Sequence, residues 1–363
     1  MTTTIAVIGA NGQVGSEVCL FLSEMDGIEV VPICRSELGA APLRSWGLES
    51  RFGALTGSEE ARRLLAGCHL VADFTLPRGD PGQMRAAATQ VQAYAIQDAP
   101  AQARYVYISS LMALGMGERS MRLKWHRLAR TQYGRFKRRS ERSATKLGRR
   151  AGREVYVLRL GEVHGERQAV SIDLMSRVGR GTVTIEDRPS IVVFAFNIAE
   201  ALVSIAAGGQ APGVYSLVCE PDWSLPEVYA YYCGRAGVEP DIVRLPDPAG
   251  DRGPVRAALS SLRAAASSTV ARFALRHRDL LATYLLASVP ELERRFRARY
   301  HLRRAASEIA ELKEQGVERP FGGAFQGRSP GRRLSGQSDC RTSMEPLAAR
   351  VRARLLFRAD ADA

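Results

Sequence analysis

A glycine-rich segment near the N-terminus constrains the fold of this chain more than any other feature. Gly9, Gly12 and Gly15 follow the short apolar run Ile5–Ile8 and are spaced as Gly-x-x-Gly-x-x-Gly. The first glycine permits a tight turn, the second lets a phosphate approach the backbone, and the third lets a helix pack closely on a strand. A helix that begins at Gln13 offers unbonded N–H groups and a positive dipole end to an anion. The segment therefore predicts a strand, a phosphate-binding turn and a helix.

Apolar runs typical of buried strands alternate with helical segments through the first half of the chain. We predict strands at 5–8, 29–34, 70–74, 104–109 and 154–160, and helices at 13–24, 58–66, 84–97 and about 121–150. Pro32 is the one residue that disagrees with its predicted strand. Alternation at this spacing implies right-handed crossovers and a doubly wound parallel sheet. The predicted class is α/β, with a Rossmann-type dinucleotide-binding domain over residues 1–165.

The pattern is less regular beyond Gly165. We predict a helix at 197–207 with Asn197 as its N-cap, a strand at 213–218, a capping box at Ser224 and Glu227, mostly helical structure at 254–314, and a last helix at 346–357. We interpret residues 166–315 as a smaller, mostly helical substrate-binding region interleaved with late Rossmann elements. Residues 316–363 are expected to form a loop or partly disordered tail that ends in a helix.

Cysteine usage and hydropathy bear on the compartment. The six cysteines are scattered without a Cys-x-x-Cys pair, and the five histidines are equally dispersed. This distribution favours reduced thiols in a cytoplasm, and it predicts no metal site. No apolar run approaches the roughly 18–20 residues that a membrane span needs. The N-terminus has no signal-peptide pattern.

The chain carries a formal net charge of +13, and much of it lies between Arg119 and Arg153, where fourteen Lys/Arg accompany one acid, Glu141. A positive field favours phosphorylated substrates, nucleotides, acidic carrier proteins or anionic lipid, and it does not choose among them. The stretch has no aromatic stacking platform or recognised motif for nucleic acid. We therefore predict no nucleic-acid function and disfavour a membrane surface.

The end of the second predicted strand should contact the adenine ribose of a dinucleotide. A site that prefers NAD usually places a carboxylate there to bond the 2′-hydroxyl. This chain has Cys34, Arg35 and Ser36 instead, and Arg44 is a weaker second contact. A guanidinium can pair with a 2′-phosphate, so NADP is the predicted cofactor and NAD remains the alternative.

Tyr133 and Lys137 form the second informative pair. Residues four apart lie on one side of a helix, so the phenol and the ammonium can point into the same cavity. A nearby ammonium favours the phenolate and is expected to lower the Tyr133 pKa toward the range of a general acid/base. The preceding strand ends in Ser109 and Ser110, in the order that a dehydrogenase needs.

Four segments carry a resemblance to a known family. They are Val7–Gly15, Tyr105–Ser110 with Gly115 after it, Tyr133–Lys137 with Glu141 after it, and Leu158–Gly165. With weaker similarities at 197–200 and 213–217, the chain resembles an extended short-chain dehydrogenase/reductase, of the NAD(P)-dependent epimerase/dehydratase family, over about residues 4–236.

This resemblance implies roles for individual residues. Tyr133 is the expected acid/base, Lys137 holds the nicotinamide ribose, and Ser110, five residues before Gly115, is favoured over Ser109 for bonding the substrate oxygen. The segment Leu160–His164 is expected to line the nicotinamide. The expected cofactor contacts are Gly9, Asn11, Gly12, Gln13, Val14, Gly15, Arg35, Ser36, Tyr133, Lys137 and Val163.

The chain departs from the family pattern in three places. Glu162 and His164 stand where the family has Asn and Tyr, Ala54 replaces an Asp that meets the adenine, and Asp73–Leu76 replaces His-x-Ala-Ala. The resemblance thus implies a divergent NADP-dependent oxidoreductase, epimerase or dehydratase. Its substrate is expected to be small and anionic, a nucleotide sugar or an intermediate linked to a carrier protein or coenzyme A. A non-catalytic NADP-sensing protein is the alternative, and a homodimer is an open expectation.

Overall fold

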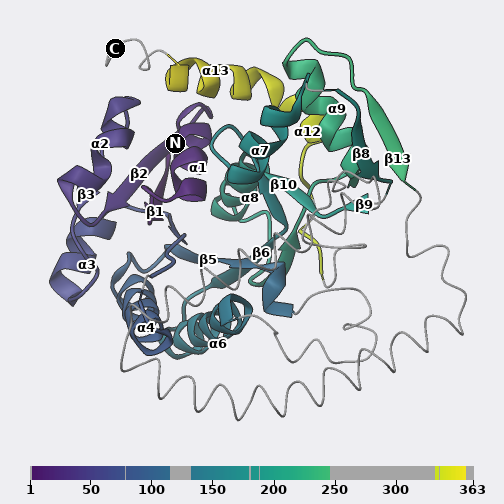
Figure 1. Ribbon diagram of the computed structural model, residues 1–363. Coiled ribbons are helices and arrows are strands. Elements are labelled where there is room, and N and C mark those ends of the chain that lie inside the picture. The colour runs from purple at the N-terminus through teal and green to yellow at the C-terminus, as the bar shows by residue number, and fades with distance from the viewer. Residues whose placement is uncertain are drawn as a thin grey trace, which may run out of the picture. The chain divides into compact units, whose positions relative to one another are not determined.

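The computed structural model (Figure 1) describes residues 2–77, 79–114, 132–179, 181–187, 189–245, 332–334 and 336–356. The described residues form two compact units. The first contains those up to 179 together with 189–240 and 332–356, and the second contains 181–187 and 241–245. In the second unit, β8 (Val183–Glu186) pairs in parallel with β13 (Ile242–Leu245).

The first unit is built on a seven-stranded sheet in which every neighbouring pair is parallel. The strand order is β11-β6-β5-β4-β1-β2-β3. The strands are β1 (Thr3–Ile8), β2 (Ile28–Cys34), β3 (Arg51–Phe52), β4 (Leu70–Asp73), β5 (Arg104–Ser110), β6 (Val155–Leu160) and β11 (Gly213–Leu217). The strand order reverses between β1 and β4, and open α/β sheets bind their ligands at such a reversal. The predicted α/β class with a doubly wound parallel sheet is confirmed, whereas the mostly helical structure predicted at 254–314 lies outside the described residues.

Pro32 is tolerated in β2 because the neighbouring strand β3 is too short to pair with it. It lies opposite Val7 of β1, whereas β3 pairs only with Ile33 and Cys34. At Pro32, β2 is therefore an edge strand on its outer side, where a missing N–H is tolerated. The discordant residue of the sequence pattern thus marks where β3 stops pairing.

Helices cover both sides of the sheet. The helices of the first unit are α1 (Gln13–Ser23), α2 (Glu37–Ser45), α3 (Ser58–Leu65), α4 (Pro81–Asp98), the short 3₁₀ helix η1 (Leu111–Leu114), α6 (Gln132–Ala151), α7 (Ala169–Arg177), α8 (Ala195–Ala206), α9 (Leu225–Arg235), α12 (Cys340–Ser343) and α13 (Glu345–Leu356). Helix α1 packs against α8, and α4 packs against α6 on the other side of the sheet (Figure 1). The sequence did not predict the short elements α2 and β3.

Local capping chemistry fixes where two of these helices begin. Asp80 accepts hydrogen bonds from the N–H groups at the start of α4, and the Gln83 side chain accepts from the Asp80 N–H. Ser224 and Glu227 make the same reciprocal bonds at the start of α9, so the predicted capping box there is confirmed.

The predicted N-cap of α8 is wrong. The helix begins at Ala195, directly after the short strand β10 (Val192–Phe194), which pairs with β7 (Glu162–His164). Asn197 lies inside the first turn, where its Oδ1 accepts a hydrogen bond from the Phe194 N–H at 3.1 Å. It is fully buried, so its amide caps the helix from within the first turn.

The last helix predicted at 346–357 corresponds to α13, whereas the described residues before it contact other elements of the first unit. The segment after Gly331 forms a bridge between Arg333 and Ser216 of β11, and Leu334, Cys340 and Met344 are buried. Helix α13 packs against α1, where Glu24 pairs with both Arg350 and Arg354 at 2.8 and 2.9 Å. The glycine, serine and arginine content of this segment gives no helix or strand pattern, because the segment is ordered by contacts with distant elements.

The remaining described pair, β9 (Pro189–Ser190) and β12 (Trp223–Ser224), is antiparallel. Among the helices that the structure describes, none has the length and apolar character that crossing a bilayer requires.

Candidate active site

The glycine turn after β1 is built so closely that side chains are excluded. Gly9 has φ of +77°, and the Gly12 N–H donates to the Gly9 carbonyl at 3.0 Å. A Cβ at Gly15 would lie 2.6 Å from that same carbonyl oxygen. The start of helix α1 therefore packs directly against the glycine turn after β1, as the glycine spacing predicted.

The start of α1 is open to an anion. Asn11, Gly12 and Gln13 are exposed, Val14 is half-buried, and the first turn of α1 carries no acidic residue. The N–H groups and the dipole of the helix therefore face solvent without a competing negative charge. The Gln13 side chain is already engaged, since its Nε2 donates to the Arg167 carbonyl at 2.8 Å. These features fit the pyrophosphate of a dinucleotide.

The carboxyl end of β2 presents one cation to solvent. Cys34 is buried, whereas Arg35 is exposed and makes no hydrogen bond or ion pair with the other described residues. Ser36 caps α2, because its Oγ accepts from the Gly39 N–H at 3.2 Å. The second predicted contact, Arg44, is instead paired with Glu37 at 3.0 Å. Arg35 is therefore the guanidinium that is available for a ribose phosphate.

Lys137 is almost fully buried in the middle of the site. Its Nζ donates to the Ile108 carbonyl at 2.7 Å and lies 5.9 Å from the centre of the Tyr133 ring. Burial lowers the pKa of Lys137 to about 8, and the nearby carboxylates of Asp73 and Glu141 oppose that shift. The pair predicted one helical turn apart thus lies on the same side of α6.

The pKa of Tyr133 is shifted in the direction opposite to the expected one. Burial of the phenol raises its pKa, and a hydrogen bond with Ser110 opposes the rise. Desolvation dominates because the phenol is removed from water while the Lys137 ammonium is bonded to a backbone carbonyl. The folded chain therefore holds Tyr133 as a protonated phenol.

The two serines at the end of β5 have different partners. Ser109 donates to Glu141 Oε1 at 2.6 Å, and Glu141 also receives two hydrogen bonds from Arg159, at 2.9 and 2.7 Å. Ser110 lies beside Tyr133 instead and accepts from the Met112 N–H at 3.2 Å. The predicted marker for choosing between them, Gly115, lies outside the described residues.

Asp73 is a site residue that the sequence reasoning treated only as a departure from a family motif. It ends β4 and is fully buried, with its Oδ1 accepting from Thr75 N and Oγ1 and its Oδ2 accepting from the Tyr105 hydroxyl at 2.6 Å. Burial raises its pKa, and the charge of Lys137 is among the opposing causes. The sequence feature that could have identified Asp73 as a site residue is a carboxylate at the end of an apolar strand.

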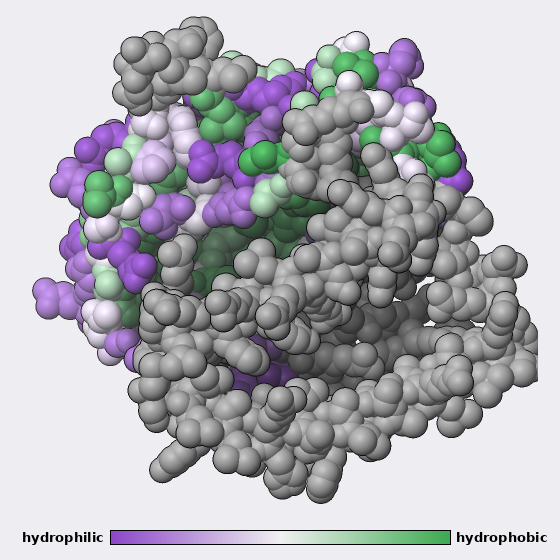
Figure 2. Space-filling model, viewed as in Figure 1, coloured by the Kyte–Doolittle hydropathy of each residue, from purple (hydrophilic) through white to green (hydrophobic). Residues whose placement is uncertain are grey.

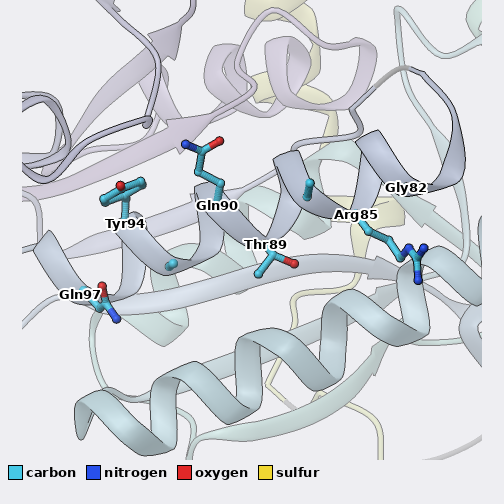
Figure 3. A pocket seen from close by; sticks show the side chains of 8 residues that line it. Gly82, Arg85, Thr89, Gln90, Tyr94 and Gln97 are labelled. Atoms are coloured by element: carbon cyan, nitrogen blue, oxygen red, sulfur yellow. The ribbon is translucent and has the colours of Figure 1, made fainter.

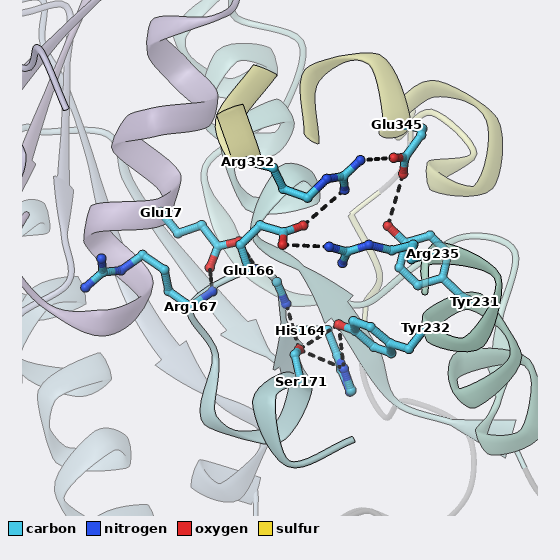
Figure 4. A network of polar contacts seen from close by, with 11 residues as sticks. Glu17, His164, Glu166, Arg167, Ser171, Tyr231, Tyr232, Arg235, Glu345 and Arg352 are labelled. Carbon is cyan, nitrogen blue, oxygen red and sulfur yellow. Dashed lines mark hydrogen bonds and ion pairs between the residues drawn. The ribbon is translucent and has the colours of Figure 1, made fainter. Parts of the chain in front are cut away.

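The segment after β6 holds the remaining predicted contacts. Val163 and Glu162 are half-buried on β7. His164 is buried, its Nδ1 lies 3.3 Å from Ser171 Oγ and 3.4 Å from the Tyr232 hydroxyl, and burial lowers its pKa to about 3. His164 is thus a neutral residue of the hydrogen-bond network in Figure 4.

A buried carboxylate on α1 holds the loop that follows β7. Glu17 accepts hydrogen bonds from the N–H groups of Glu166 and Arg167 at 2.6 and 3.1 Å, and from Gln168 Nε2 at 2.8 Å. Burial raises the pKa of Glu17, and these bonds oppose the rise. The loop is therefore fixed to the first two turns of the helix that carries the glycine turn.

Glu166 extends the same network toward the C-terminal helix (Figure 4). It pairs with Arg235 of α9 at 2.7 Å and with Arg352 of α13 at 3.2 Å, and Arg352 also pairs with Glu345. All of these side chains are partly or largely withdrawn from water. The network joins α1, the loop after β7, α9 and α13, and sequence reasoning missed it.

The surface has two hollows of different character. The face seen in Figure 2 is hollowed near its centre, where hydrophobic side chains are visible below a hydrophilic upper rim. A separate hollow of about 610 Å³ lies against α4 and includes none of the predicted site residues (Figure 3). Within the described part of the chain, no group of His, Cys, Asp and Glu could hold a metal ion.

Residues 5–181 match the model of the NAD dependent epimerase/dehydratase family. None of the curated proteins matches the sequence closely enough to count as a relative.

Among solved structures, UDP-N-acetylglucosamine 4-epimerase from Bacillus cereus aligns with a TM-score of 0.54 and 16% identity, over 68% of this chain and 86% of that one. UDP-glucuronic acid 4-epimerase from Bacillus cereus, solved with UDP-glucuronic acid and NAD, aligns with a TM-score of 0.50 and 16% identity, over 68% and 87%. At this identity the two structures show a shared fold.

Proposed function

We propose that this chain, whose residues 5–181 match the NAD dependent epimerase/dehydratase family, is an enzyme of the extended short-chain dehydrogenase/reductase type and uses NADP. The reaction is hydride transfer between the nicotinamide and a carbonyl or carbinol carbon of a small anionic substrate. Tyr133 is the acid/base, with Ser110 and Lys137 beside it.

One observation carries this proposal. Tyr133 lies with Ser110 at the carboxyl end of β5, and the Lys137 ammonium is one turn further along α6. A phenol, a hydroxyl and an ammonium are the three groups that proton transfer at a substrate oxygen needs in this class of chemistry. Their convergence from two separate segments supports a catalytic role over a structural one.

The cofactor, when bound, supplies the hydride acceptor and donor. The chain's own residues bind and orient the reactants and move the proton. The α1 N-terminus and the glycine turn hold the pyrophosphate, and Lys137 holds the nicotinamide ribose. Ser110 Oγ hydrogen-bonds the substrate oxygen, and Tyr133 Oη exchanges a proton with that oxygen.

The pKa values of Tyr133 and Lys137 favour carbonyl reduction, in which Tyr133 acts as the acid. Because burial keeps the phenol protonated, it is ready to donate a proton to a carbonyl oxygen. Lys137, with a pKa of about 8, carries a positive charge at neutral pH that stabilises the phenolate left behind. Oxidation of a carbinol would need the phenolate and should therefore require higher pH.

NADP is favoured by Arg35. It is exposed at the ribose end of β2, and Glu37, the next carboxylate, is engaged by Arg44. The two Bacillus cereus epimerases leave NAD as the alternative, since one of them was solved with NAD. Comparing kcat/KM for NADPH and NADH in wild type and Arg35→Ala decides this: loss confined to NADPH supports NADP.

The substrate class follows from charge and from the neighbours. Both aligned epimerases act on UDP sugars, which are anionic and would suit a basic protein. A nucleotide sugar is therefore the first substrate class, and a carrier- or coenzyme A-linked intermediate is the second. The substrate is proposed to bind through residues 166–315, and the free state of all six cysteines supports a cytoplasmic location.

The test is NADPH oxidation with a panel of nucleotide sugars and ketone or thioester substrates. Tyr133→Phe removes only the hydroxyl and should lower kcat by about 10²–10⁴-fold with the cofactor still bound. Arg139→Gln, on the opposite side of α6, is the control and should leave kcat unchanged. Undiminished turnover by Tyr133→Phe would exclude the mechanism. Tight NADPH binding without turnover on any substrate would favour the sensing protein.

A further inference from the structure

Two of the six cysteines touch each other although they are far apart in the sequence. Cys219 follows β11, and Cys340 is the first residue of the short helix α12. The Cys340 thiol donates a hydrogen bond to the Cys219 sulfur, with 3.6 Å between the two sulfur atoms, across 121 positions of the chain. Within the described residues, this is the one hydrogen bond that joins two cysteines. It links the end of a strand of the sheet to the C-terminal segment, by which we mean residues 332–356.

Backbone pairing along the outer edge of the sheet brings the two sulfur atoms together. The strand β11 lies at the edge of the seven-stranded sheet. Its Ser216 donates its N–H to the Arg332 carbonyl at 2.8 Å and accepts from the Leu334 N–H at 3.3 Å. Three residues after Ser216, the Cys219 N–H donates to the Val192 carbonyl at 2.7 Å. The cysteine after β11 is therefore fixed by main-chain bonds, and the C-terminal segment is aligned with the same strand.

The two thiols of the pair differ in acidity. Hydrogen bonding with Cys219 lowers the pKa of the Cys340 thiol, burial opposes this, and the Trp223 side chain lowers the pKa further. Burial raises the pKa of Cys219, whose thiol donates to Asn197 Oδ1 at 3.3 Å. The thiolate is the reactive form of a cysteine. Cys340 is therefore the nucleophile of the pair, and Cys219 is the thiol beside it.

The other four cysteines behave as ordinary buried thiols. They are Cys19, Cys34, Cys68 and Cys233. Burial raises the pKa of each of them. A buried thiol of this kind packs as a small apolar side chain and is inert. Packing alone accounts for these four cysteines, whereas it does not account for a contact between two sulfur atoms with a lowered pKa on one of them.

The element that covers the pair is short. Cys219 and Cys340 are 2% and 1% exposed. Helix α12 has only four residues, and Ser338, Arg341 and Thr342 around Cys340 are exposed. A helix of one turn makes few bonds of its own, so it opens locally more easily than the sheet beneath it. Such an opening admits a small oxidant to the sulfur of Cys340.

We propose that Cys219 and Cys340 are a redox-sensitive pair that a peroxide converts into a disulfide, which joins the C-terminal segment covalently to the end of β11. The Cys340 thiolate attacks one oxygen of hydrogen peroxide. The O–O bond breaks, the sulfur is oxidised to a sulfenic acid, and the leaving hydroxide takes up a proton to form water. The Cys219 thiol then loses its proton and attacks the Cys340 sulfur, so that the S–S bond forms, the S–O bond breaks and a second water leaves. Two thiols and one peroxide thus give one disulfide and two waters.

The disulfide holds more than helix α12. The C-terminal segment continues into α13, where Arg352 pairs with Glu166 of the loop after β7 at 3.2 Å, and Arg350 pairs with Glu24 of α1 at 2.8 Å. In the reduced chain these contacts are all noncovalent. Oxidation therefore holds α13 beside the helix that follows the glycine turn. Disulfides in a reducing compartment are usually transient and redox-sensing, and this proposal does not depend on the cofactor or substrate.

The first experiment counts thiols in the full chain. The chain is reduced with dithiothreitol, freed of the reductant and treated with a small excess of hydrogen peroxide. Its remaining thiols are then alkylated with iodoacetamide in guanidinium chloride. The oxidised chain should carry two labels fewer than the six of the reduced chain by intact mass, and dithiothreitol should restore them. Peptide mapping should find Cys219 linked to Cys340. A different linkage, or six labels after peroxide treatment, would overturn the proposal.

Variants test the order of the two steps. Cys340→Ala removes the nucleophile and should keep all of its remaining thiols after peroxide treatment. Cys219→Ala should form no disulfide and should accumulate a sulfenic acid at Cys340, which dimedone traps. Cys233→Ala is the matched control, because it also removes a buried thiol, and it should still lose two labels. A disulfide formed by Cys340→Ala would contradict the assignment. Should a variant not fold, the peptide map of wild type decides by itself.

The second experiment measures thermal unfolding. Oxidised wild type should unfold about 5 °C or more above reduced wild type, because a link across 121 positions restricts the unfolded chain. Dithiothreitol should abolish the shift, and Cys340→Ala should show none. An unchanged or lowered midpoint in a chain that mass spectrometry shows to be cross-linked would mean that the link strains the fold, which contradicts a disulfide that holds the C-terminal segment in place.

Discussion

The two sides of helix α6 treat charge in opposite ways. On the inner side, Lys137 and Glu141 are about 95% buried and lie against the ends of β5 and β6, with hydrogen bonds to Ile108, Ser109 and Arg159. On the outer side, several exposed cations make no ion pair with another described residue; they are Arg139, Arg142, Lys146, Arg149 and Arg150. One run of basic sequence thus contributes both buried ionisable groups and exposed cations.

The contrast shows that the density of charged residues along a segment does not determine which of them are buried and which are exposed. Lys137 and Arg138 are adjacent in sequence, yet the lysine is buried and the arginine is only half-buried. Burial changes the acidity of Lys137, whereas solvent screens the exposed arginines of α6. Substitutions on the inner side should therefore change stability and pH dependence, and those on the outer side should change salt dependence.

The largest effect is expected at Glu141. Glu141→Ala leaves the partly buried Arg159 guanidinium and the Ser109 hydroxyl without their acceptor. The variant should lose about 3–5 kcal/mol of unfolding free energy, which urea denaturation measures. Arg142→Ala, the neighbouring change on the outer side, should stay within about 0.5 kcal/mol. Similar losses in both would erase the distinction between the two sides.

The next effect is a pH dependence at Lys137. Its folded pKa of about 8 is below the ordinary value of 10.5, so between these pH values the unfolded chain holds a proton that the folded chain has released. Stability should therefore rise with pH through this window, by at most about 1.4 kcal/mol per pH unit, relative to Lys137→Met.

The matched control for that measurement is Lys146→Met. Lys146 is exposed in the folded chain, so its removal should leave the difference in unfolding free energy from wild type flat between pH 8 and pH 10. A flat difference for Lys137→Met as well would mean that Asp73 and Glu141 keep the buried ammonium charged.

A smaller effect separates the two serines that contact the inner side. Ser109→Ala should cost about 1–3 kcal/mol of stability, because Glu141 loses one of its donors, and it should change turnover little. Ser110→Ala should do the reverse, with reduced kcat and nearly wild-type unfolding. Urea denaturation and NADPH oxidation on both variants make the comparison. An exchange of the two phenotypes would move the catalytic role to Ser109.

The smallest effect is on the outer side. Arg149→Ala removes one cation from the exposed side of α6 and should stabilise the chain by a few tenths of a kcal/mol at low salt. The gain should vanish at high ionic strength, where such repulsion is screened. Arg63→Ala breaks the pair with Glu60 and should shift stability the other way. Thermal unfolding at two salt concentrations is sufficient, and a destabilised Arg149→Ala would argue against unrelieved repulsion.

Prediction from the sequence succeeded where the signal was local. The buried strands and the turn at Gly9 and Gly15 follow from runs of apolar residues and from glycine spacing, and they lie where expected. The prediction that Asn197 is the N-cap of α8 was wrong. Asn197 accepts a hydrogen bond from the Phe194 N–H from inside the helix, a position that a capping rule does not anticipate. The roles of Ser110, Tyr133, Lys137 and the cofactor contacts stay predictions.

The sequence by itself determined the parallel sheet, the glycine turn and the placement of a tyrosine and a lysine on one side of a helix, because each depends on spacing along the chain. Only the tertiary structure decided which charges are buried. Glu17 is held by main-chain N–H groups about 150 residues away, and Asp73 is held by Tyr105 of the neighbouring strand. Burial and acidity depend on such contacts between distant segments, and local patterns do not encode them.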